Sequence, residues 1–306
     1  MANILEDLSD VPGVCALQYT PPRAGGSTLL IELPHGATRT SDYEALRGRL
    51  RGRLPEHLEE FFYVNTDIGT PECAAWIAEA LAAEGHGALV VRCLVPRTFI
   101  DCNRVVAGSI PGMMIDGLTP AVASYIEDPE DRALLEELHR AYHELTERAY
   151  RQLCGSGGLA LQLHSYAPRS VGVERVDHEI VAALRRAYAP GIAETWPERP
   201  AVDVICADAE GTMWADPELV AAVRAAFAAS GIEARENATY CLHPATMGYQ
   251  YARMYPRKVL CVELNRGLLA DPFIPLRASP IGAHGVERMS RPVATALSQA
   301  LARLGG

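Results

Sequence analysis

The sequence lacks several features that define other classes of protein. Its 306 residues contain no apolar run near the ~18 residues that a membrane span needs, and no internal repeat. No two of its eight cysteines have the C-x-x-C spacing of a zinc ribbon or a redox motif. Basic residues are in the minority, 28 against 38 acidic ones, and the formal charge is −10. We therefore expect a globular protein with neither nucleic acid nor membrane as a partner.

The cysteines occur mostly in apolar stretches such as RCLVPRTFIDCNR and KVLCVEL. This pattern is typical of small buried side chains in a reducing compartment rather than of a disulfide framework. The first residues, MANILEDLSDVPGV, carry acidic residues where a signal peptide has basic ones, and no apolar segment follows. A cytoplasmic enzyme is therefore expected.

Short apolar runs alternate with helical patterns along the chain. We expect buried strands at STLLIEL, FFYV, GALVVRC, GLALQL, AVDVICAD and RKVLCVELN. The longest helical pattern covers about residues 128–153, and others follow at PELVAAVRAAFAASG and from about 291 to 304. A helix after FFYV is predicted to have Thr70 as its N-cap and to end at Gly85 or Gly87.

Strands that alternate with helices predict parallel pairing with right-handed crossovers. No linker or change in composition divides the chain. The sequence therefore predicts a single α/β domain over residues 1–306, with a mixed, mostly parallel sheet and helices on both faces. A helical insertion is expected at about residues 105–153.

Polar residues gather where the apolar runs stop. In an open α/β sheet, ligands bind at the carboxyl ends of the strands. Two histidines and a carboxylate on separate strand ends are what a catalytic zinc needs, with a fourth position left to water. A histidine at a strand end is also, quite commonly, an ordinary hydrogen-bonded polar residue. The candidates at these positions are His35, Asp67, the group Asp101, Asn103 and Arg104, then His164 and Glu263.

The order of these motifs resembles that of the N-formylglutamate amidohydrolase family, over roughly residues 28–270. The segments that carry the resemblance are LPHG, NTDIGTPECAAWIAEAL, PRTFIDCNR, LQLHSYAP, ENATY and VLCVELNRGLL. They are also similar to a reduced zinc-carboxypeptidase site, in which an Asn-Arg pair, a His-Ser-Tyr segment and a late Glu recur. The resemblance implies a zinc carboxypeptidase-like fold and the hydrolysis of an amide bond by metal-activated water.

Residue by residue, the resemblance implies that His35, Asp67 and His164 bind one Zn²⁺ per chain, and that Glu263 is the general base. The chemistry agrees, because zinc lowers the pKa of bound water toward ~7 and a nearby carboxylate can pass its proton to the leaving nitrogen. Glu263 has a structural alternative, an ion pair with Arg266 at a sheet edge.

Asp67 also has a structural alternative, as an Asx turn or cap of the helix that follows it. In that case Glu72 is the substitute ligand. The carboxypeptidase-type His-x-x-Glu is missing, since Thr38 stands three residues after His35. This departure disfavours a small zinc carboxypeptidase.

Asn103 and Arg104 resemble the pair that binds the substrate's α-carboxylate, which a guanidinium meets with two parallel hydrogen bonds. Asp101 is expected to hold Arg104 or Arg97 in place. The resemblance to the family implies that Arg97 stabilises the oxyanion of the tetrahedral intermediate. A surface ion pair between Asp101 and Arg104, of little energy, is the alternative. The expected partner is a small-molecule amide that bears a carboxylate.

The resemblance also implies that Asn237 binds the substrate, but it weakens after this residue, where ATYCLHPATMGYQY replaces the family's glycine-rich loop. This difference leaves the specific substrate open. Tyr240 and His243 are candidate specificity residues, and packing of the aromatic ring is the alternative role for Tyr240. The sequence thus predicts a zinc amidohydrolase for an N-formyl or N-acyl amino acid. A carboxylate-binding protein without catalysis and a cysteine hydrolase that uses Cys241 or Cys102 with His243 are alternatives.

Overall fold

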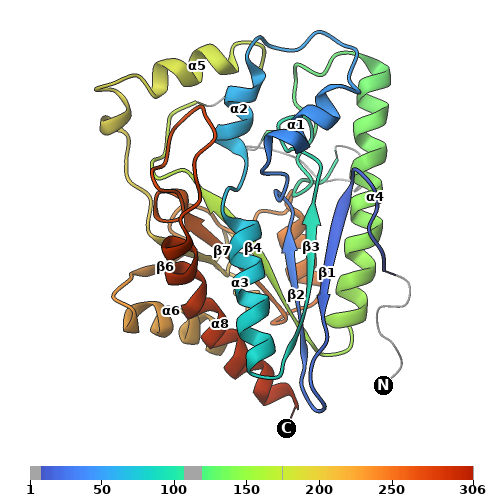
Figure 1. The fold of residues 1–306 in the computed structure, drawn as a ribbon, viewed down its shortest axis with the longest axis vertical. Coiled ribbons are helices and arrows are strands. Elements are labelled where there is room, and N and C mark those ends of the chain that lie inside the picture. The colour runs from blue at the N-terminus through green and yellow to red at the C-terminus, as the bar shows by residue number, and fades with distance from the viewer. Residues whose placement is uncertain (1–7, 107–118, 174, 306) are drawn as a thin grey trace.

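A seven-stranded sheet forms the centre of the molecule in the computed structural model, which describes residues 8–106, 119–173 and 175–305 (Figure 1). The strand order is β1-β3-β2-β4-β7-β5-β6. The strands are β1 (Cys15–Thr20), β2 (Thr28–Leu33), β3 (Gly87–Cys93), β4 (Leu159–Tyr166), β5 (Val202–Ile205), β6 (Ala234–Glu236) and β7 (Val259–Asn265).

The centre of the sheet is parallel, as predicted. Strands β3, β2, β4 and β7 run in one direction, while β1 is antiparallel to β3 and β5 is antiparallel to β7. Parallel strands bring their carboxyl ends to one edge of the sheet, so the loops after β2, β3 and β4 meet there. The single α/β domain with a mixed, mostly parallel sheet is confirmed.

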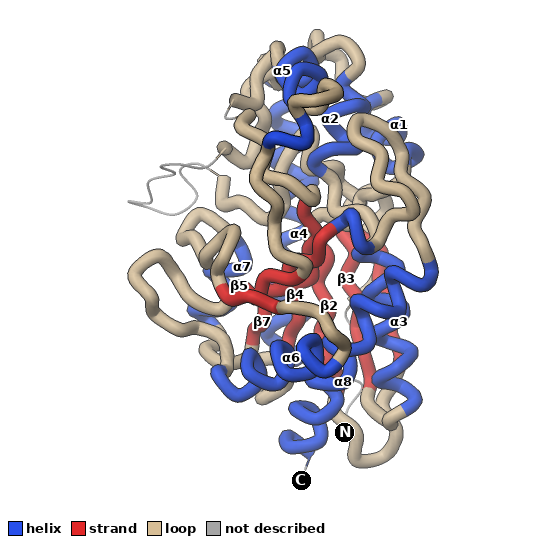
Figure 2. The backbone as a smooth tube through the Cα atoms, turned by 90° about the vertical axis from the view of Figure 1, so that its left-hand side faces the viewer, coloured by secondary structure: helices blue, strands red, loops and turns tan. Residues whose placement is uncertain are grey.

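Helices cover both faces of the sheet (Figure 2). Strand β2 explains why, because its alternating side chains enter two different cores: Leu29 and Ile31 belong to one, and Leu30 to the other. Helices α3, α6 and α8 pack on the first face, and α4 and α7 on the second. The helices are α1 (Thr40–Arg47), α2 (Leu58–Asn65), α3 (Thr70–Ala83), α4 (Pro129–Leu153), α5 (Ile180–Ala187), α6 (Pro217–Ala229), α7 (Met247–Met254) and α8 (Ala283–Gly305).

The strand predicted at FFYV is wrong, because these residues lie in helix α2. Leu58, Phe61 and Phe62 are the buried residues of this helix, and their spacing of three and four residues places them on one helical face. The predicted N-cap Thr70 is also wrong by one residue. Gly69 is the N-cap, in a left-handed conformation with φ of 83°, and the helix ends at Ala83.

Two further boundaries differ from the sequence prediction. The first is the start of helix α8, which begins at Ala283 rather than near Arg291 and contains Pro292. The second difference is that the sequence did not predict the short strands β1 and β6. The insertion expected at about residues 105–153 falls between β3 and β4; it contains α4, and its residues 107–118 lie outside the described residues. None of the described helices is both long and apolar enough to cross a membrane.

Candidate metal centre and active site

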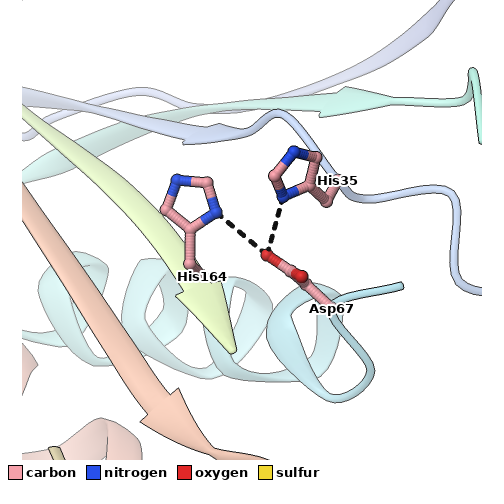
Figure 3. Close-up of side chains that lie close together, drawn as sticks. All are labelled: His35, Asp67 and His164. Atoms are coloured by element: carbon pink, nitrogen blue, oxygen red, sulfur yellow. Dashed lines mark hydrogen bonds and ion pairs between the residues drawn. The ribbon is translucent and has the colours of Figure 1, made fainter. Parts of the chain in front are cut away.

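Three side chains from different parts of the fold converge at the carboxyl edge of the sheet (Figure 3). His35 follows β2, Asp67 lies in the loop between α2 and α3, and His164 belongs to β4. The Nδ1 atoms of His35 and His164 lie 3.1 and 2.9 Å from Oδ2 of Asp67. All three side chains are buried, and their ligand atoms lie within 4.8 Å of one another. This group can hold a metal ion.

The outer nitrogens of both imidazoles are engaged by oxygen atoms. Nε2 of His35 lies 2.7 Å from Oδ1 of Asp101, and Nε2 of His164 lies 3.2 Å from Oε1 of Gln162. An oxygen acceptor favours a proton on Nε2, which leaves the lone pair of Nδ1 for a metal. Two imidazoles and one carboxylate therefore fit a catalytic zinc ion, which takes three protein ligands.

Asp67 is held as a carboxylate by the charges around it. Burial by itself would raise its pKa, but the imidazoles of His35 and His164 keep that pKa well below its usual value. On the other side, Arg266 lies 3.1 Å from Oδ1 of Asp67, and Arg97 lies 4.0 Å from it. One oxygen of the carboxylate therefore contacts the two histidines, and the other oxygen lies near the two arginines.

The capping alternative for Asp67 involves its backbone rather than its side chain. The carbonyl oxygen of Asp67 accepts from the Thr70 hydroxyl at 2.7 Å, while the carboxylate faces the histidines. Glu72, the substitute ligand, is exposed in the first turn of α3. The geometry thus brings Asp67, and not Glu72, to the two histidines.

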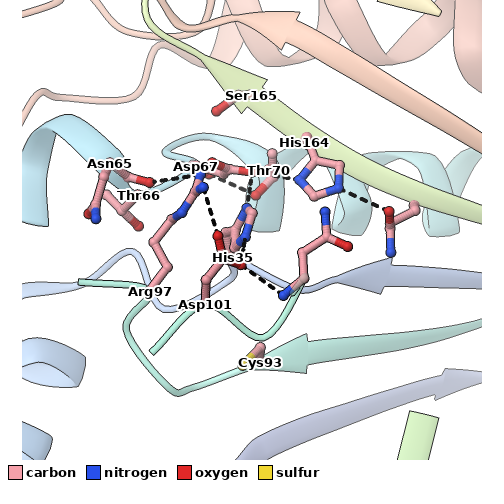
Figure 4. A network of polar contacts seen from close by, with 12 residues as sticks. His35, Asn65, Thr66, Asp67, Thr70, Cys93, Arg97, Asp101, His164 and Ser165 are labelled. Carbon is pink, nitrogen blue, oxygen red and sulfur yellow. Dashed lines mark hydrogen bonds and ion pairs between the residues drawn. The ribbon is translucent and has the colours of Figure 1, made fainter. Parts of the chain in front are cut away.

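Asp101 connects His35 to Arg97 (Figure 4) and also lies near Arg104. Its Oδ2 lies 2.8 Å from Arg97 and 3.9 Å from Arg104, and its Oδ1 accepts from the backbone of Asn103 at 2.8 Å. Burial raises the pKa of Asp101, but Arg97 and His35 hold it well below its usual value. This buried carboxylate is thus more than the surface partner of Arg104.

Glu263 lies beside His164 in the register of β4 and β7. Strand β7 is an internal strand, so Glu263 is not at a sheet edge, and the ion pair of Arg266 is with Asp67. Its Oε2 is buried and has no hydrogen-bond partner among the described residues. Burial raises the pKa of Glu263 to about 7, which is the range of a general base near neutral pH.

Arg104 also has unused hydrogen-bonding capacity. Its Nε atom is buried without a partner within the described ranges, and its Nη1 donates to the Asn103 carbonyl at a long 3.4 Å. Burial lowers the pKa of Arg104. The side chain of Asn103 accepts from the backbone of Gly248 at 3.1 Å, which ties this loop to α7. A guanidinium in this state is suited to bind an anionic ligand.

These groups line a cavity of about 390 Å³. Asp67, Arg104 and Glu263 belong to its charged part. Apolar side chains from α2 and α5 contribute another part of its lining, among them Phe61 and Ile180. Such a combination fits a small organic molecule with a charged end.

The candidate specificity residues behave differently from one another. Tyr240 and His243 line the cavity; Tyr240 is 43% exposed, and the Arg199 guanidinium lies 5.4 Å from its ring centre. Asn237, which was expected to bind the substrate, is not among the residues that line the cavity. Its side-chain oxygen accepts from the backbone of Cys206 at 2.9 Å, which gives it a role in the loop after β5.

The cysteine alternative has little support in the geometry. Cys102 is fully buried, and its contact with Cys93 together with burial raises its pKa well above the usual value, so it is a poor nucleophile. Cys241 lines the cavity, but Nδ1 of His243 accepts from the backbone of Ala245 at 3.1 Å.

Sequence reasoning missed two residues that contact the metal-ligand candidates directly. Gln162 contacts His164, and Arg266 contacts Asp67; Arg266 was considered only as a partner of Glu263. A signal for both existed, since each is a polar residue within or directly after an apolar strand. Burial of such groups needs a partner.

The chain is similar to a known protein family and to several solved structures. The model of the family described as N-formylglutamate amidohydrolase matches residues 27–270. No curated protein sequence gives a significant match. Solved structures do match. An N-formylglutamate amidohydrolase from Ralstonia eutropha JMP134 has a TM-score of 0.56 and 18% identity, over 94% of this chain and 98% of that chain.

Two further structures extend the comparison. A gene product from Agrobacterium tumefaciens has a TM-score of 0.51 and 14% identity, over 96% of each chain. A metallo-carboxypeptidase from Burkholderia cenocepacia is also among the structural neighbours, with a TM-score of 0.37 and 10% identity, over 98% of this chain and 66% of that chain.

Proposed function

Because the chain belongs to the N-formylglutamate amidohydrolase family, we propose that it is a zinc-dependent hydrolase that cleaves the amide bond of an N-formyl or other N-acyl amino acid. Family membership supports the hydrolysis of an amide. One observation supports the proposal of a metal ion: Nδ1 of His35, Nδ1 of His164 and Oδ2 of Asp67 converge in a buried group. Zinc bound there would polarise the substrate carbonyl and bring the pKa of a water molecule toward ~7.

Glu263 is the general base of this proposal. Its buried Oε2 has no partner in the described part of the chain and can receive the proton of the attacking water. The same carboxyl group then delivers that proton to the leaving nitrogen, so that Glu263 is regenerated as a carboxylate. A pKa of about 7 suits both transfers near neutral pH.

Two arginines have separate roles in the proposal. Arg97, held by Asp101 at 2.8 Å, stabilises the negative charge that develops on the carbonyl oxygen. Arg104 and Asn103 bind the carboxylate of the amino-acid portion, supported by the unpaired Nε of Arg104. Tyr240 lines the cavity and contributes to the choice of substrate.

A substrate screen with controlled metal content tests the proposal. N-formyl, N-acetyl and N-carbamoyl amino acids, including N-formylglutamate, are incubated with the protein as purified, after removal of metal by a chelator, and after addition of Zn²⁺. We expect hydrolysis of at least one acyl class, its loss with the chelator and its return with zinc. Hydrolysis that persists in the metal-free protein would contradict the metal-dependent mechanism. Failure of the zinc-loaded protein on every acyl class would contradict the substrate class.

A further inference from the structure

A line of buried hydrogen bonds runs from the interior of the sheet to His164. Glu32 on β2 and Gln162 on β4 are register partners, and Nε2 of Gln162 donates to Oε2 of Glu32 at 3.0 Å. Oε1 of the same amide lies 3.2 Å from Nε2 of His164. Glu32 and Gln162 are 0% and 1% exposed, so water does not compete for these contacts. The far end of the line, Nδ1 of His164, faces Asp67.

The partners of Glu32 fix the direction of this line. Its carboxylate also accepts from the hydroxyls of Tyr142 at 3.0 Å and Tyr150 at 2.7 Å. Oε2 of Glu32 accepts from both Tyr150 and Gln162, so Gln162 turns its NH₂ group toward Glu32 and its oxygen toward His164. The thiol of Cys261, which donates to the same Oε1 at 3.6 Å, agrees with this orientation. Nε2 of His164 must then carry the proton that it donates to Gln162.

We propose that Glu32 is a positioning residue that acts through Gln162 to set the tautomer of His164. A proton kept on Nε2 leaves the lone pair of Nδ1 directed at the metal position beside Asp67. The part of this inference that concerns zinc affinity rests on the proposed function, but the proton on Nε2 does not; in the metal-free protein Nδ1, which faces Oδ2 of Asp67 at 2.9 Å, can carry a second proton. Partners of this kind around a metal-binding histidine typically change metal affinity by about 10- to 100-fold when they are removed.

Gly248 of α7 is a second position at which a substitution would disturb this line of hydrogen bonds. A Cβ atom at this position would lie 2.4 Å from Oε1 of Gln162 and 3.3 Å from Sγ of Cys261. No side chain fits there unless the amide moves, so a substitution at Gly248 displaces Gln162 while Glu32 and His164 remain unchanged. It provides a test that leaves the buried carboxylate in place.

Three variants test the inference. Glu32→Gln preserves shape, but the new amide at position 32 can donate to Oε1 of Gln162 and turn the NH₂ group of Gln162 toward His164. Gly248→Ala displaces the Gln162 amide. Tyr142→Phe is the matched control, because it removes one donor to the same carboxylate without changing the direction of the line. Circular dichroism and thermal unfolding establish that each variant is folded.

Two readouts are measured on every folded variant. The dissociation constant for Zn²⁺ comes from competition with a chelator, and the protonation of the His164 nitrogens comes from long-range ¹H–¹⁵N correlation spectra of the metal-free and zinc-loaded protein. We expect Nε2 of His164 to be protonated in the wild-type protein and in Tyr142→Phe. Glu32→Gln and Gly248→Ala should lose that proton or its hydrogen bond and weaken zinc binding by about 10- to 100-fold, against less than about threefold for Tyr142→Phe.

The outcomes separate this inference from the proposed function. An unprotonated Nε2 of His164 in the wild-type protein overturns the inference, whatever the zinc affinity. Wild-type zinc affinity and spectra in both Glu32→Gln and Gly248→Ala also overturn it. If the wild-type protein binds no zinc, the proposed function fails, and the spectra of the metal-free protein still decide whether Glu32 and Gln162 keep a proton on Nε2 of His164. If Glu32→Gln does not fold, Gly248→Ala provides the same comparison.

Discussion

Glu32 and Glu263 lie on β2 and β7, the two strands that flank β4, but their surroundings differ. Burial raises the pKa of both. Glu32 accepts hydrogen bonds from Tyr142, Tyr150 and Gln162, whereas Oε2 of Glu263 has no partner among the described residues and the residue lines the cavity. A carboxylate whose partners are all in place holds its neighbours in position. One that lacks partners is available to a substrate.

Two arginines near the cavity repeat this contrast. Arg266 donates to the carbonyl of Ser165 at 2.8 Å and to Asp67 at 3.1 Å, and it is 3% exposed. Arg104 has a buried Nε with no partner in the described part of the protein. We interpret Arg266 as a support of the candidate metal site and Arg104 as a group that is available to bind a ligand.

The largest expected effect comes from Glu263→Gln, which keeps the shape of the side chain and removes the base. The turnover number should fall by about 10²- to 10⁴-fold, the usual contribution of a general base. The zinc content should stay at the wild-type level, because Glu263 is not among the proposed ligands. Steady-state kinetics and elemental analysis of the same preparation check both parts. Activity within a few-fold of the wild type would make Glu263 a structural residue like Glu32.

Arg104→Lys should have the next largest effect, and only on acidic substrates. A lysine replaces the planar fork of the guanidinium by a point charge, which is expected to lower kcat/KM by about 10- to 100-fold. The corresponding amide of the same substrate never uses the second hydrogen bond and should show little change. The two substrates are compared on the wild-type and variant enzymes.

Equal losses on the acid and on the amide would change the interpretation of Arg104. The residue would then be structural, as Arg266 is, or would act on the oxyanion. Recognition of a carboxylate would no longer be part of the proposed function.

The smallest effect concerns the pH dependence of stability in the metal-free protein. The pKa of Glu263 is about 7 in the folded state, against 4.5 for a glutamate in the unfolded chain. The stabilising contribution of this residue is therefore complete below about pH 4.5 and is lost as pH rises through 7. Glu263→Gln cannot lose a proton. Its free energy of unfolding, relative to the wild type, should therefore increase between pH 5 and pH 8, by an amount on the order of 1–3 kcal/mol.

Urea denaturation of both metal-free proteins at several pH values measures this difference. Curves of unfolding free energy against pH that run parallel for the wild type and Glu263→Gln would show that the carboxyl group titrates normally. The contrast with Glu32 would then lie in hydrogen bonding alone.

Much of the fold follows from the sequence because buried parallel strands are recognisable as short apolar runs. The exception is instructive. FFYV is too short for its period to separate a strand from a helix, and packing of Phe61 and Phe62 against the core decides for α2. The short strands β1 and β6 depend on pairing with distant neighbours, which a local pattern does not contain.

The candidate site was predictable in part for the same reason. His35 and His164 stand at the ends of apolar runs, and a parallel sheet brings such ends together. Asp67 follows a helix rather than a strand, so its approach to them depends on the loop before α3. The contact of Asp101 with His35 joins residues 66 positions apart, and that of Gln162 with Glu32 joins residues 130 apart. Side-chain partners at such separations are set by the tertiary structure.

Metal analysis of matched variants tests the central claim most directly. The wild type, His35→Ala, His164→Ala and Asp67→Ala are compared with His284→Ala, whose histidine is exposed, after equilibration with Zn²⁺ and removal of the excess. We predict about one zinc per chain in the wild type and in His284→Ala, and little in the other three, with all five proteins folded by circular dichroism. Full occupancy in both His35→Ala and His164→Ala would contradict the account.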